Sequence, residues 1–407
     1  MRRDRPGIET SVEDELKVTV GNGITMAPEP GHTHGVLAVS RTGAVAAFFQ
    51  SGSANYYRVS PDGGQTWGDQ IKAPLWAGGA CSGPLRDGGV IKSLCDGSAP
   101  LGEAQFRVSP LDGEFKDGWF TVHSTFAWFS DDFSSREVAP VKVYMPDAVT
   151  IKQTQFNVSF WPIFDKGKII QLANGDLLAP MYGLFKGDTK SRVVLSRSSD
   201  RGHTWRYYAT VAAPPTDPNP ELPGDYNGPC EPSIALLPDG QMICVMRIQG
   251  AHHPPYKPLY ASWSSDEGKT WTKPIPTQPH LDNVWPTLAV PDNGVVACLY
   301  GRPGVHVVFS TDNGHTWTNR VTFTNLPGWP TLPLGTKTGF IGHYADLVKV
   351  GPNKLLAIAA VGQGVGSPEN RGTRVFPITV ERVKDGSLVL PGRVYHELGY
   401  SGPINGE

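Results

Sequence analysis

Long hydrophobic runs, a strong net charge and abundant cysteine are all missing from this sequence. No stretch of about 18 apolar residues occurs, so no membrane-spanning helix is expected. The formal net charge of −2 and the pI near 6.6 argue against a protein that binds nucleic acid through a basic surface. Five cysteines are too few for a disulfide scaffold, and no spacing resembles a zinc site. We therefore expect no cofactor and no required metal, with calcium in a loop left open as an alternative.

The amino-terminal segment 1–6 carries three arginines, and no apolar segment follows it. A secretory signal peptide needs an apolar core of about 7–15 residues, so none is expected in this chain. The compartment stays open: the protein could be cytoplasmic, or secreted or periplasmic with its signal already removed.

Glycine, proline and tryptophan are plentiful, with 47, 37 and 11 residues. Long helical patterns are few. This composition favours many short strands joined by tight turns, and therefore an all-β fold.

One octapeptide pattern, Ser-x-Asp-x-Gly-x-Thr-Trp, occurs four times, at 60–67, 198–205, 264–271 and 310–317. Ser and Asp side chains can bond nearby backbone N–H groups, and Gly supplies the positive φ that a tight turn needs. The Trp offers a large apolar surface for packing between sheets. The pattern is therefore interpreted as a structural turn that reports the fold, and not as an active site.

These octapeptides resemble the Asp-box of sialidases and their relatives. Their starts lie 138, 66 and 46 residues apart, and a decayed copy at Ser130-Asp-Asp132 divides the long interval into 70 and 68. The resemblance implies a six-bladed β-propeller of four-stranded antiparallel sheets, formed by residues 1–407 as one domain. The sixth blade falls between His343 and Val383, and the early strand 16–20 is expected to complete it, because closure removes exposed sheet edges.

A second register places polar side chains at equivalent strand ends. Each unit opens with a hairpin, and the turns are 41–43, 86–88, 173–175, 238–240, 292–294 and 351–353. The start of the first strand and the end of the second lie side by side in an antiparallel hairpin. In each hairpin we count from the last residue of its turn. The residues nine positions before it are His34, Lys166, Glu231, Trp285 and Tyr344. The residues seven or eight positions after it are Gln50, Tyr182, Arg247 and Arg302. We expect these residues to converge on one mouth of the propeller.

The segment from Pro229 to Val361 resembles sialidases most specifically. Glu231 and Arg247 match the central blade, which carries a Glu at its start and a substrate-binding arginine at its end, and Tyr300-Gly-Arg302 resembles the next such arginine. His343-Tyr344-Ala-Asp346 resembles the segment with the nucleophilic tyrosine, while Asp346 itself is expected to be structural. The resemblance implies that Tyr344 is the nucleophile, Glu231 its base, and Arg247 and Arg302 the clamp for a substrate carboxylate. Each could instead serve only the fold.

Two parts of the family pattern are missing. Segment 31–36 has no arginine where the first clamp arginine is expected, and segment 51–57 has no acid where the acid/base is expected. His32 or His34 could supply a proton or a positive charge there, since a histidine titrates near neutral pH. Asp96 is a spare candidate acid.

The leading hypothesis is a glycoside hydrolase that releases a terminal sialic acid or related sugar acid. The alternatives are an exo-glycosidase for a neutral sugar such as arabinose, a uronate-specific polysaccharide lyase, and a non-catalytic glycan-binding propeller. In the last, Trp285, Trp161 and Tyr182 would stack on sugars. Fold alone does not decide among them.

The expected partner is a glycan or oligosaccharide, with no nucleic acid and no membrane. Two insertions are expected, at about 101–159 and 214–229. The first could cover the mouth of the propeller or make a contact in a homo-oligomer, and long ordered loops are often functional.

Overall fold

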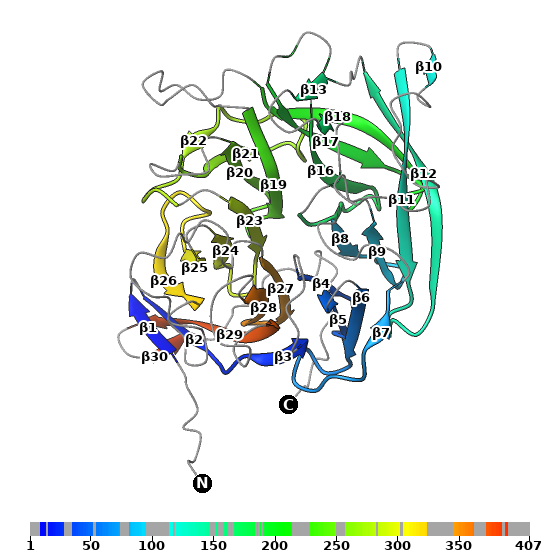
Figure 1. The fold of residues 1–407 in the computed structure, drawn as a ribbon. Helices are drawn as coiled ribbons and strands as arrows, with labels where there is room; N and C mark the ends of the chain where they lie inside the picture. The colour runs from blue at the N-terminus through cyan, green and yellow to red at the C-terminus, as the bar shows by residue number, and fades with distance from the viewer. Residues whose placement is uncertain are drawn as a thin grey trace. The chain divides into compact units, whose positions relative to one another are not determined.

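The computed structural model describes an all-β protein, with no helix among the described residues (Figure 1). The chain divides into two compact units. Unit 1 consists of residues 1–78 and 287–407, and unit 2 of residues 79–286. The boundary between Pro286 and Thr287 falls within strand β23 (Val284–Ala289). The described residues are 9–13, 15–27, 35–51, 54–73, 81–94, 114–116, 119–146, 151–153, 158–160, 164, 167–183, 185, 188, 190–213, 228–249, 257–281, 284–301, 304–323, 345–361, 372–384 and 387–389.

Unit 1 contains two complete four-stranded arrays that share a core. Leu37 and Phe49 of one array pack with Leu356 and Ile358 of the other. The first array is β4 (Val36–Val39), β5 (Val45–Ser51), β6 (Ala54–Ser60) and β7 (Ile71–Lys72), and the sixth and last is β27 (Ala345–Gly351), β28 (Lys354–Val361), β29 (Gly372–Lys384) and β2 (Leu16–Val20).

Strand β2 completes the last array from the other end of the chain, as the sequence predicts. It pairs antiparallel with β29, from Leu16 opposite Arg382 to Val20 opposite Ile378. Strands β1 (Glu9–Glu13), β3 (Ile24–Ala27) and β30 (Ser387–Val389) extend the same sheet.

Asp346 is structural, as expected from the sequence. It is 1% exposed; Oδ2 accepts a hydrogen bond from Leu37 N at 2.8 Å and Oδ1 one from Leu347 N at 2.8 Å. The carboxylate therefore ties β27 to β4.

Unit 2 holds the next three arrays. The second array is β8 (Ser82–Pro84), β9 (Val90–Ser93), β11 (Trp119–Phe129) and β12 (Arg136–Pro146), the third is β15 (Ile170–Gln171), β16 (Leu177–Gly183), β17 (Arg192–Ser198) and β18 (Thr204–Ala212), and the fourth is β19 (Gly228–Leu236), β20 (Met242–Gln249), β21 (Tyr260–Ser264) and β22 (Ile275–Pro276). The fifth is β23 (Val284–Ala289), β24 (Val296–Gly301), β25 (Val305–Ser310) and β26 (Thr318–Thr322). Six four-stranded arrays confirm the six-bladed, all-β propeller.

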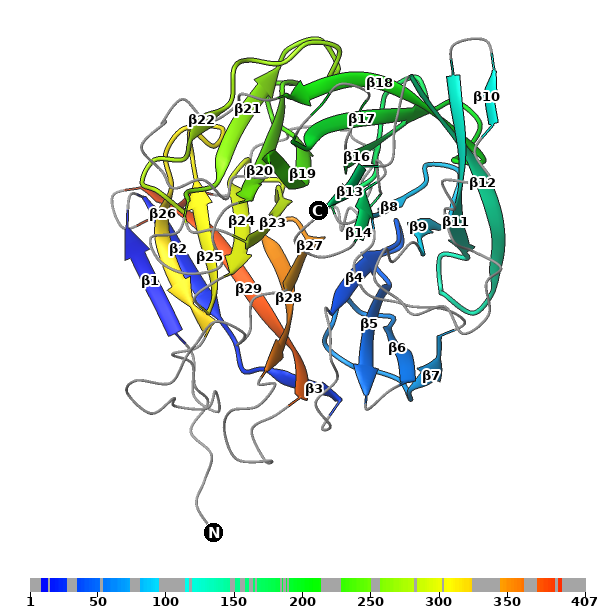
Figure 2. The same ribbon diagram turned by 45° about the horizontal axis from the view of Figure 1, so that its top comes forward.

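The range 101–159, expected as an insertion, contains the outer hairpin of the second blade. Strands β11 and β12 have 11 residues each, and only Phe126–Phe129 of β11 pair with β9. The rest of the hairpin runs beyond the blade as a long ribbon (Figure 2), which β10 (Glu114–Lys116) joins. The sequence separation looked too long for one blade because these two strands are long. Strands β13 (Ile151–Gln153) and β14 (Val158–Phe160) form a separate hairpin.

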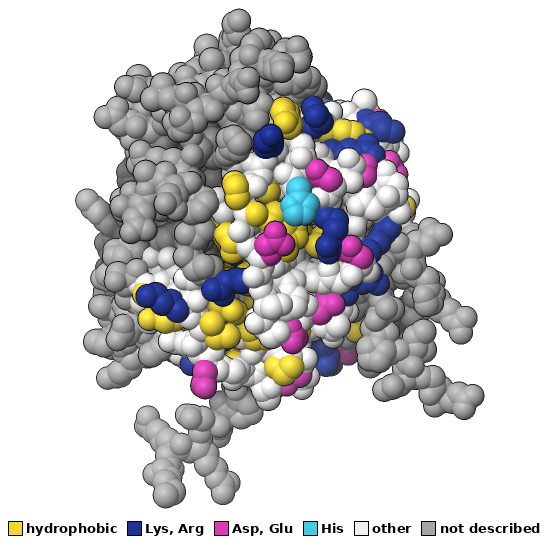
Figure 3. Space-filling view, turned by 90° about the vertical axis from the view of Figure 1, so that its right-hand side faces the viewer, with side chains coloured by type: hydrophobic (Ala, Val, Ile, Leu, Met, Phe, Trp, Pro, Cys, Tyr) yellow, Lys and Arg dark blue, Asp and Glu magenta, His cyan; other side chains and the backbone are white. Residues whose placement is uncertain are grey.

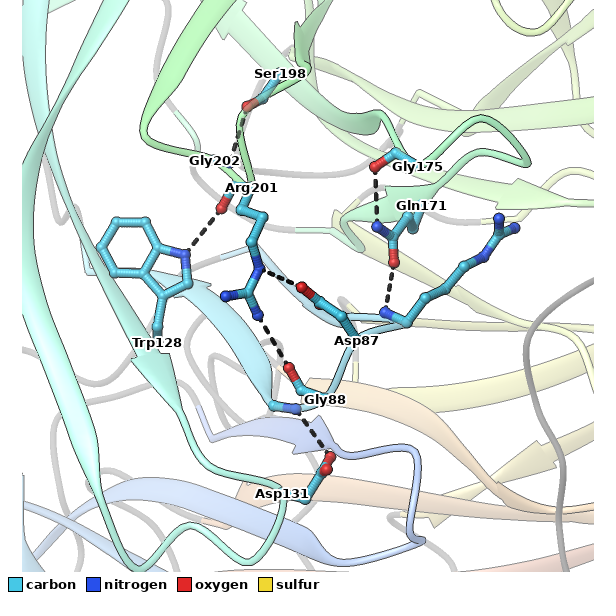
Figure 4. Close-up of polar contacts among 11 residues, drawn as sticks. Asp87, Gly88, Trp128, Asp131, Gln171, Gly175, Ser198, Arg201 and Gly202 are labelled. Atoms are coloured by element: carbon cyan, nitrogen blue, oxygen red, sulfur yellow. Dashed lines mark hydrogen bonds and ion pairs between the residues drawn. The ribbon is translucent and has the colours of Figure 1, made fainter.

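The ribbon also joins the second blade to the third. Strand β12 pairs in parallel with β18, with Lys142 opposite Thr204 and Tyr144 opposite Arg206. Nearby, the Trp128 indole donates a hydrogen bond to the carbonyl oxygen of Arg201 at 2.9 Å (Figure 4). The Arg201 guanidinium pairs with Asp87 at 2.9 Å. One continuous hydrogen-bonded sheet therefore runs through both blades.

The Asp-boxes form the expected side-chain-to-backbone turns. In the third, Ser264 Oγ donates to Asp266 at 2.8 Å and accepts from Gly268 N at 2.9 Å. Asp266 accepts from Thr270 N at 2.9 Å, and the Trp271 indole donates to Gly268 O at 2.9 Å. The same bonds recur in the boxes at 60–67 and 198–205. The motif is therefore a hydrogen-bonded turn.

The decayed copy at Ser130 keeps the Ser–Asp contact, with Ser130 Oγ donating to Asp132 at 2.6 Å. Phe133 takes the first left-handed position, with φ 59°. The next residue is Ser134, and glycine is the residue that adopts a left-handed conformation without steric cost. The turn closes instead through Ser135, whose N–H donates to Ser130 Oγ at 3.0 Å. The interpretation as a decayed Asp-box is confirmed by this geometry.

Box glycines also allow close contact between blades. A Cβ atom on Gly202 (φ 90°) would lie 2.2 Å from Ile91 Cδ1 of the second blade, whereas one on Gly175 (φ 94°) would meet nothing within 4 Å. We expect Gly202→Ala to lower the free energy of unfolding by about 2–4 kcal/mol, from backbone strain plus overpacking. Gly175→Ala, the matched control, should cost only the strain, about 1 kcal/mol. Urea denaturation checks this, and equal losses would contradict the close-contact argument.

Acid should weaken the boxes. Hydrogen bonds from the Thr270 hydroxyl and N–H hold the pKa of Asp266 at about 2, below its ordinary value of 3.8. Because the folded pKa is the lower one, this stabilisation is present above about pH 4 and is lost as the pH falls toward about 2. We expect the melting temperature of the wild type to exceed that of Asp266→Asn at neutral pH, and the gap to shrink between about pH 4 and 2. A gap independent of pH would contradict this assignment.

Candidate functional site

A buried ion pair lies at the end of the first hairpin in the fourth blade. Glu231 Oε1 accepts a hydrogen bond from Arg247 Nη1 at 2.7 Å, and the two residues are 7% and 3% exposed. Strand pairing is regular from Ser233 onward but shifts between Cys230 and Ser233, and Arg247 faces Cys230. Glu231 therefore occupies a β-bulge, a device that re-aims a side chain and is common next to active sites.

The backbone of Glu231 is strained. Its φ of 47° lies in the left-handed region, although Pro232 follows it and a residue before proline favours extended backbone. A non-glycine residue in such a conformation costs on the order of 1–3 kcal/mol, and such residues cluster at functional sites. The bulge and the strain together set the direction of the carboxylate.

The second oxygen of Glu231 is held by the next blade. Oε2 accepts a hydrogen bond from the backbone N–H of Trp285 at 3.0 Å. Trp285 repeats the geometry of Glu231: it precedes a proline, Pro286, and its φ is 54°. It is also 5% exposed. Both residues thus stand nine positions before the turn glycine of their hairpins, in the same strained conformation.

This arrangement defines what Glu231 can do chemically. A carboxylate has about four lone-pair sites, and Arg247 and the Trp285 amide occupy one on each oxygen. The remaining sites can accept a hydrogen bond or a proton from a hydroxyl. A buried ion pair is weak evidence of a stabilising role, because desolvation of both charges opposes their attraction. The pair is therefore the strongest candidate for chemistry among the described residues.

Two other predicted site residues lie at strand ends, as the register required. Tyr182, near the end of β16, is 8% exposed and packs in a cluster with Cys230 and Ile248. Gln50, in unit 1 near the end of β5, is 6% exposed and faces Asn55 across the hairpin. Burial leaves little of the Tyr182 ring for sugar stacking, and the substrate roles of both remain predictions.

Tyr344, Arg302, His32 and His34 lie outside the described residues, as do Asp96, Lys166 and Trp161. The described site is therefore Glu231 with Arg247 and Trp285. The bulge and the left-handed conformations at Glu231 and Trp285 could not be inferred from strand patterns. Both residues precede a proline at the same register position, and a proline there predicts extended backbone at the residue before it.

Four cysteines lie in the described part of the chain. Cys81, Cys230, Cys244 and Cys298 are all buried thiols. Burial raises the pKa of the Cys244 and Cys298 thiols far above the ordinary value, as expected for small buried side chains. Within the part of the chain that the structure describes, no cluster of His, Cys, Asp and Glu could hold a metal ion, and no helix could span a membrane.

Charged side chains of both signs are interspersed on the face in Figure 3. Lysine and arginine alternate there with aspartate and glutamate, and hydrophobic side chains form only small groups among the described residues.

The fold and its boxes define a β-propeller built from repeated Asp-box blades. The chain belongs to the family of BNR repeat-like domains, which matches residues 147–361, more than half of the chain. A sialidase from Paraclostridium sordellii is 26% identical over 174 residues, which are 37% of this chain and 38% of that protein.

Solved structures share the fold at low identity. A protein of unknown function from Dyadobacter fermentans DSM 18053 is 17% identical with a TM-score of 0.58, and 89% of this chain and 99% of that chain are covered. The GH93 α-L-arabinofuranosidase of Fusarium graminearum, in complex with arabinobiose, is 12% identical with a TM-score of 0.55, over 88% and 98% of the two chains.

Proposed function

We propose that the protein is a glycoside hydrolase that releases a terminal sugar acid, such as sialic acid, from a glycan. The observation that carries the proposal is the buried Glu231–Arg247 pair, set in strained backbone at a β-bulge. It lies at the position where the sequence resembles the catalytic blade of sialidases. The similarity to the curated sialidase supports the same class of reaction.

Each candidate residue then has a defined role. The Tyr344 phenol oxygen attacks the anomeric carbon while Glu231 takes its proton, and the glycosidic bond breaks as His32 or His34 protonates the leaving oxygen. Water then hydrolyses the glycosyl-enzyme and restores the free phenol. Arg247 and Arg302 bind the substrate carboxylate, for which a guanidinium fork is well suited.

The test is a release assay on aryl glycosides of sialic acid, its deaminated analogue, a uronic acid and arabinofuranose. Wild type and Tyr344→Phe are compared on each sugar. Release from an acidic sugar that falls at least about 100-fold in the variant supports the proposal. Release from only a neutral sugar, unchanged in the variant, would refute the tyrosine nucleophile. A product that absorbs ultraviolet light would indicate a lyase.

A neutral furanose is the second candidate substrate. Segment 31–36 contains no arginine, so one of the three clamp groups for a carboxylate is absent from the sequence. The arabinofuranosidase of Fusarium graminearum shares the fold over nearly the whole chain. The arabinofuranose arm of the same assay decides between the two sugars.

A further inference from the structure

We propose that the backbone amide of Trp285, held in a left-handed conformation before Pro286, positions the Glu231 carboxylate for proton transfer. The inference rests on the proposed function, because it assigns a positioning residue to that reaction. It concerns the main chain of Trp285 and is separate from any contact of its indole with a sugar.

The contact is buried and has an ordinary hydrogen-bond length. The Trp285 N–H donates to Glu231 Oε2 at 3.0 Å, while Arg247 binds the other oxygen at 2.7 Å. Both carboxylate oxygens are thus tied to rigid groups, one within the same hairpin and one in the following blade. A carboxylate fixed at both ends cannot rotate about its terminal bond, so its free lone pairs keep one direction.

The direction of the amide depends on the conformation of Trp285. Rotation about φ turns the N–H relative to the rest of the residue, so the hydrogen bond to Glu231 is tied to the observed φ of 54°. That value is disfavoured both for a residue with a Cβ atom and for a residue before proline. Strained backbone persists where the surroundings over-determine it, and it recurs in active sites as a means of preorganisation.

Glu231 and Trp285 share this strain at equivalent positions of successive blades. Glu231 has φ 47° before Pro232, nine residues ahead of Gly240, and Trp285 stands nine residues ahead of Gly294. The two strained residues are directly hydrogen-bonded to each other. If the two strained conformations were unrelated, nothing would require them to share a hydrogen bond at one carboxylate. If they serve to orient the carboxylate, both are needed.

Two isomeric side chains separate the backbone role from the side-chain role. Trp285→Leu and Trp285→Ile remove the indole and add the same atoms, but the β-branched Ile opposes a positive φ more strongly than Leu does. We expect the two variants to have equal KM values, because both lack the indole. We expect kcat of Trp285→Ile to be about 10- to 100-fold below that of Trp285→Leu, because a misplaced catalytic group loses rate on this scale. Trp285→Gly should keep kcat near that of Trp285→Leu, since glycine adopts positive φ freely.

A stability measurement tests the coupling without any activity. The melting temperature of Trp285→Ile should lie below that of Trp285→Leu, and this gap should narrow in a Glu231→Gln background. The neutral amide binds the N–H more weakly than a carboxylate does, so less holds residue 285 in its strained conformation.

The outcomes separate this inference from the proposed function. If the wild type releases no sugar, the proposed function fails and the melting temperatures alone decide. A difference in melting temperature between Trp285→Ile and Trp285→Leu that is equal in the wild-type and Glu231→Gln backgrounds would then overturn the inference. In an active enzyme, equal kcat values for the Leu and Ile variants overturn it. A lower kcat for Ile that glycine restores supports it.

Discussion

Replacing Glu231 by glutamine should lower kcat by about 10²–10⁴-fold, the usual contribution of a general base. Glutamine keeps the shape of the side chain and an oxygen that can accept the Trp285 N–H, but it cannot take a proton from a phenol. The loss should therefore fall on kcat. The measurement is a release assay on the sugar that the wild type cleaves, at a temperature where circular dichroism shows the variant folded.

The control for this experiment is the same substitution at an exposed strand residue outside the site. Glu137→Gln removes one carboxylate from β12 without touching Glu231, and any loss of rate from it should be far smaller. A Glu231→Gln enzyme that keeps kcat within about threefold of the wild type would remove Glu231 from the chemistry.

Replacing Arg247 by methionine should lower the free energy of unfolding by about 3–5 kcal/mol. Methionine retains a long apolar stem, so little space is left empty. The Glu231 carboxylate, however, stays buried at 7% exposure and loses the guanidinium at 2.7 Å. An uncompensated buried charge is among the most destabilising changes that a single substitution can make. Urea denaturation of the folded protein gives the value.

The double variant Glu231→Gln/Arg247→Met is the matched control. It removes both charges and keeps an acceptor for the Trp285 N–H, so it should recover at least half of the stability that Arg247→Met loses. A cost below about 1 kcal/mol for Arg247→Met would mean that water reaches the carboxylate, and the site would then be open instead of buried.

The fold could be predicted from local chemistry because the repeat is local. Each Asp-box closes its own turn with side-chain hydrogen bonds, so eight residues suffice to identify it, and even the decayed copy at Ser130 was recognisable. Strand β2 was predicted because the last blade lacked a partner. The long ribbon of β11 and β12 was not predicted, since strand length beyond a blade and the parallel pairing with β18 depend on neighbours distant in sequence.

For the candidate site, the sequence predicted which residues lie together but not the backbone conformation that orients them. Register placed Glu231 and Arg247 at adjoining strand ends, and the structure joins them at 2.7 Å. Trp285 contacts Glu231 through its main chain, and its predicted role in binding substrate stays a prediction. Sequence patterns report side-chain chemistry, whereas a backbone amide is present at every residue except proline and is selected by conformation alone.

The pairing of β2 with β29 has a consequence for biosynthesis. Leu16 leaves the ribosome 366 residues before its partner Arg382. At about 5–20 residues per second, translation keeps the two apart for roughly 20–70 s. During that interval the nascent β2 has no β29 to pair with, and an unpaired strand edge is a template for aggregation. The interval between the synthesis of β2 and that of β29 is therefore the stage at which a holding chaperone would most increase the yield of folded protein.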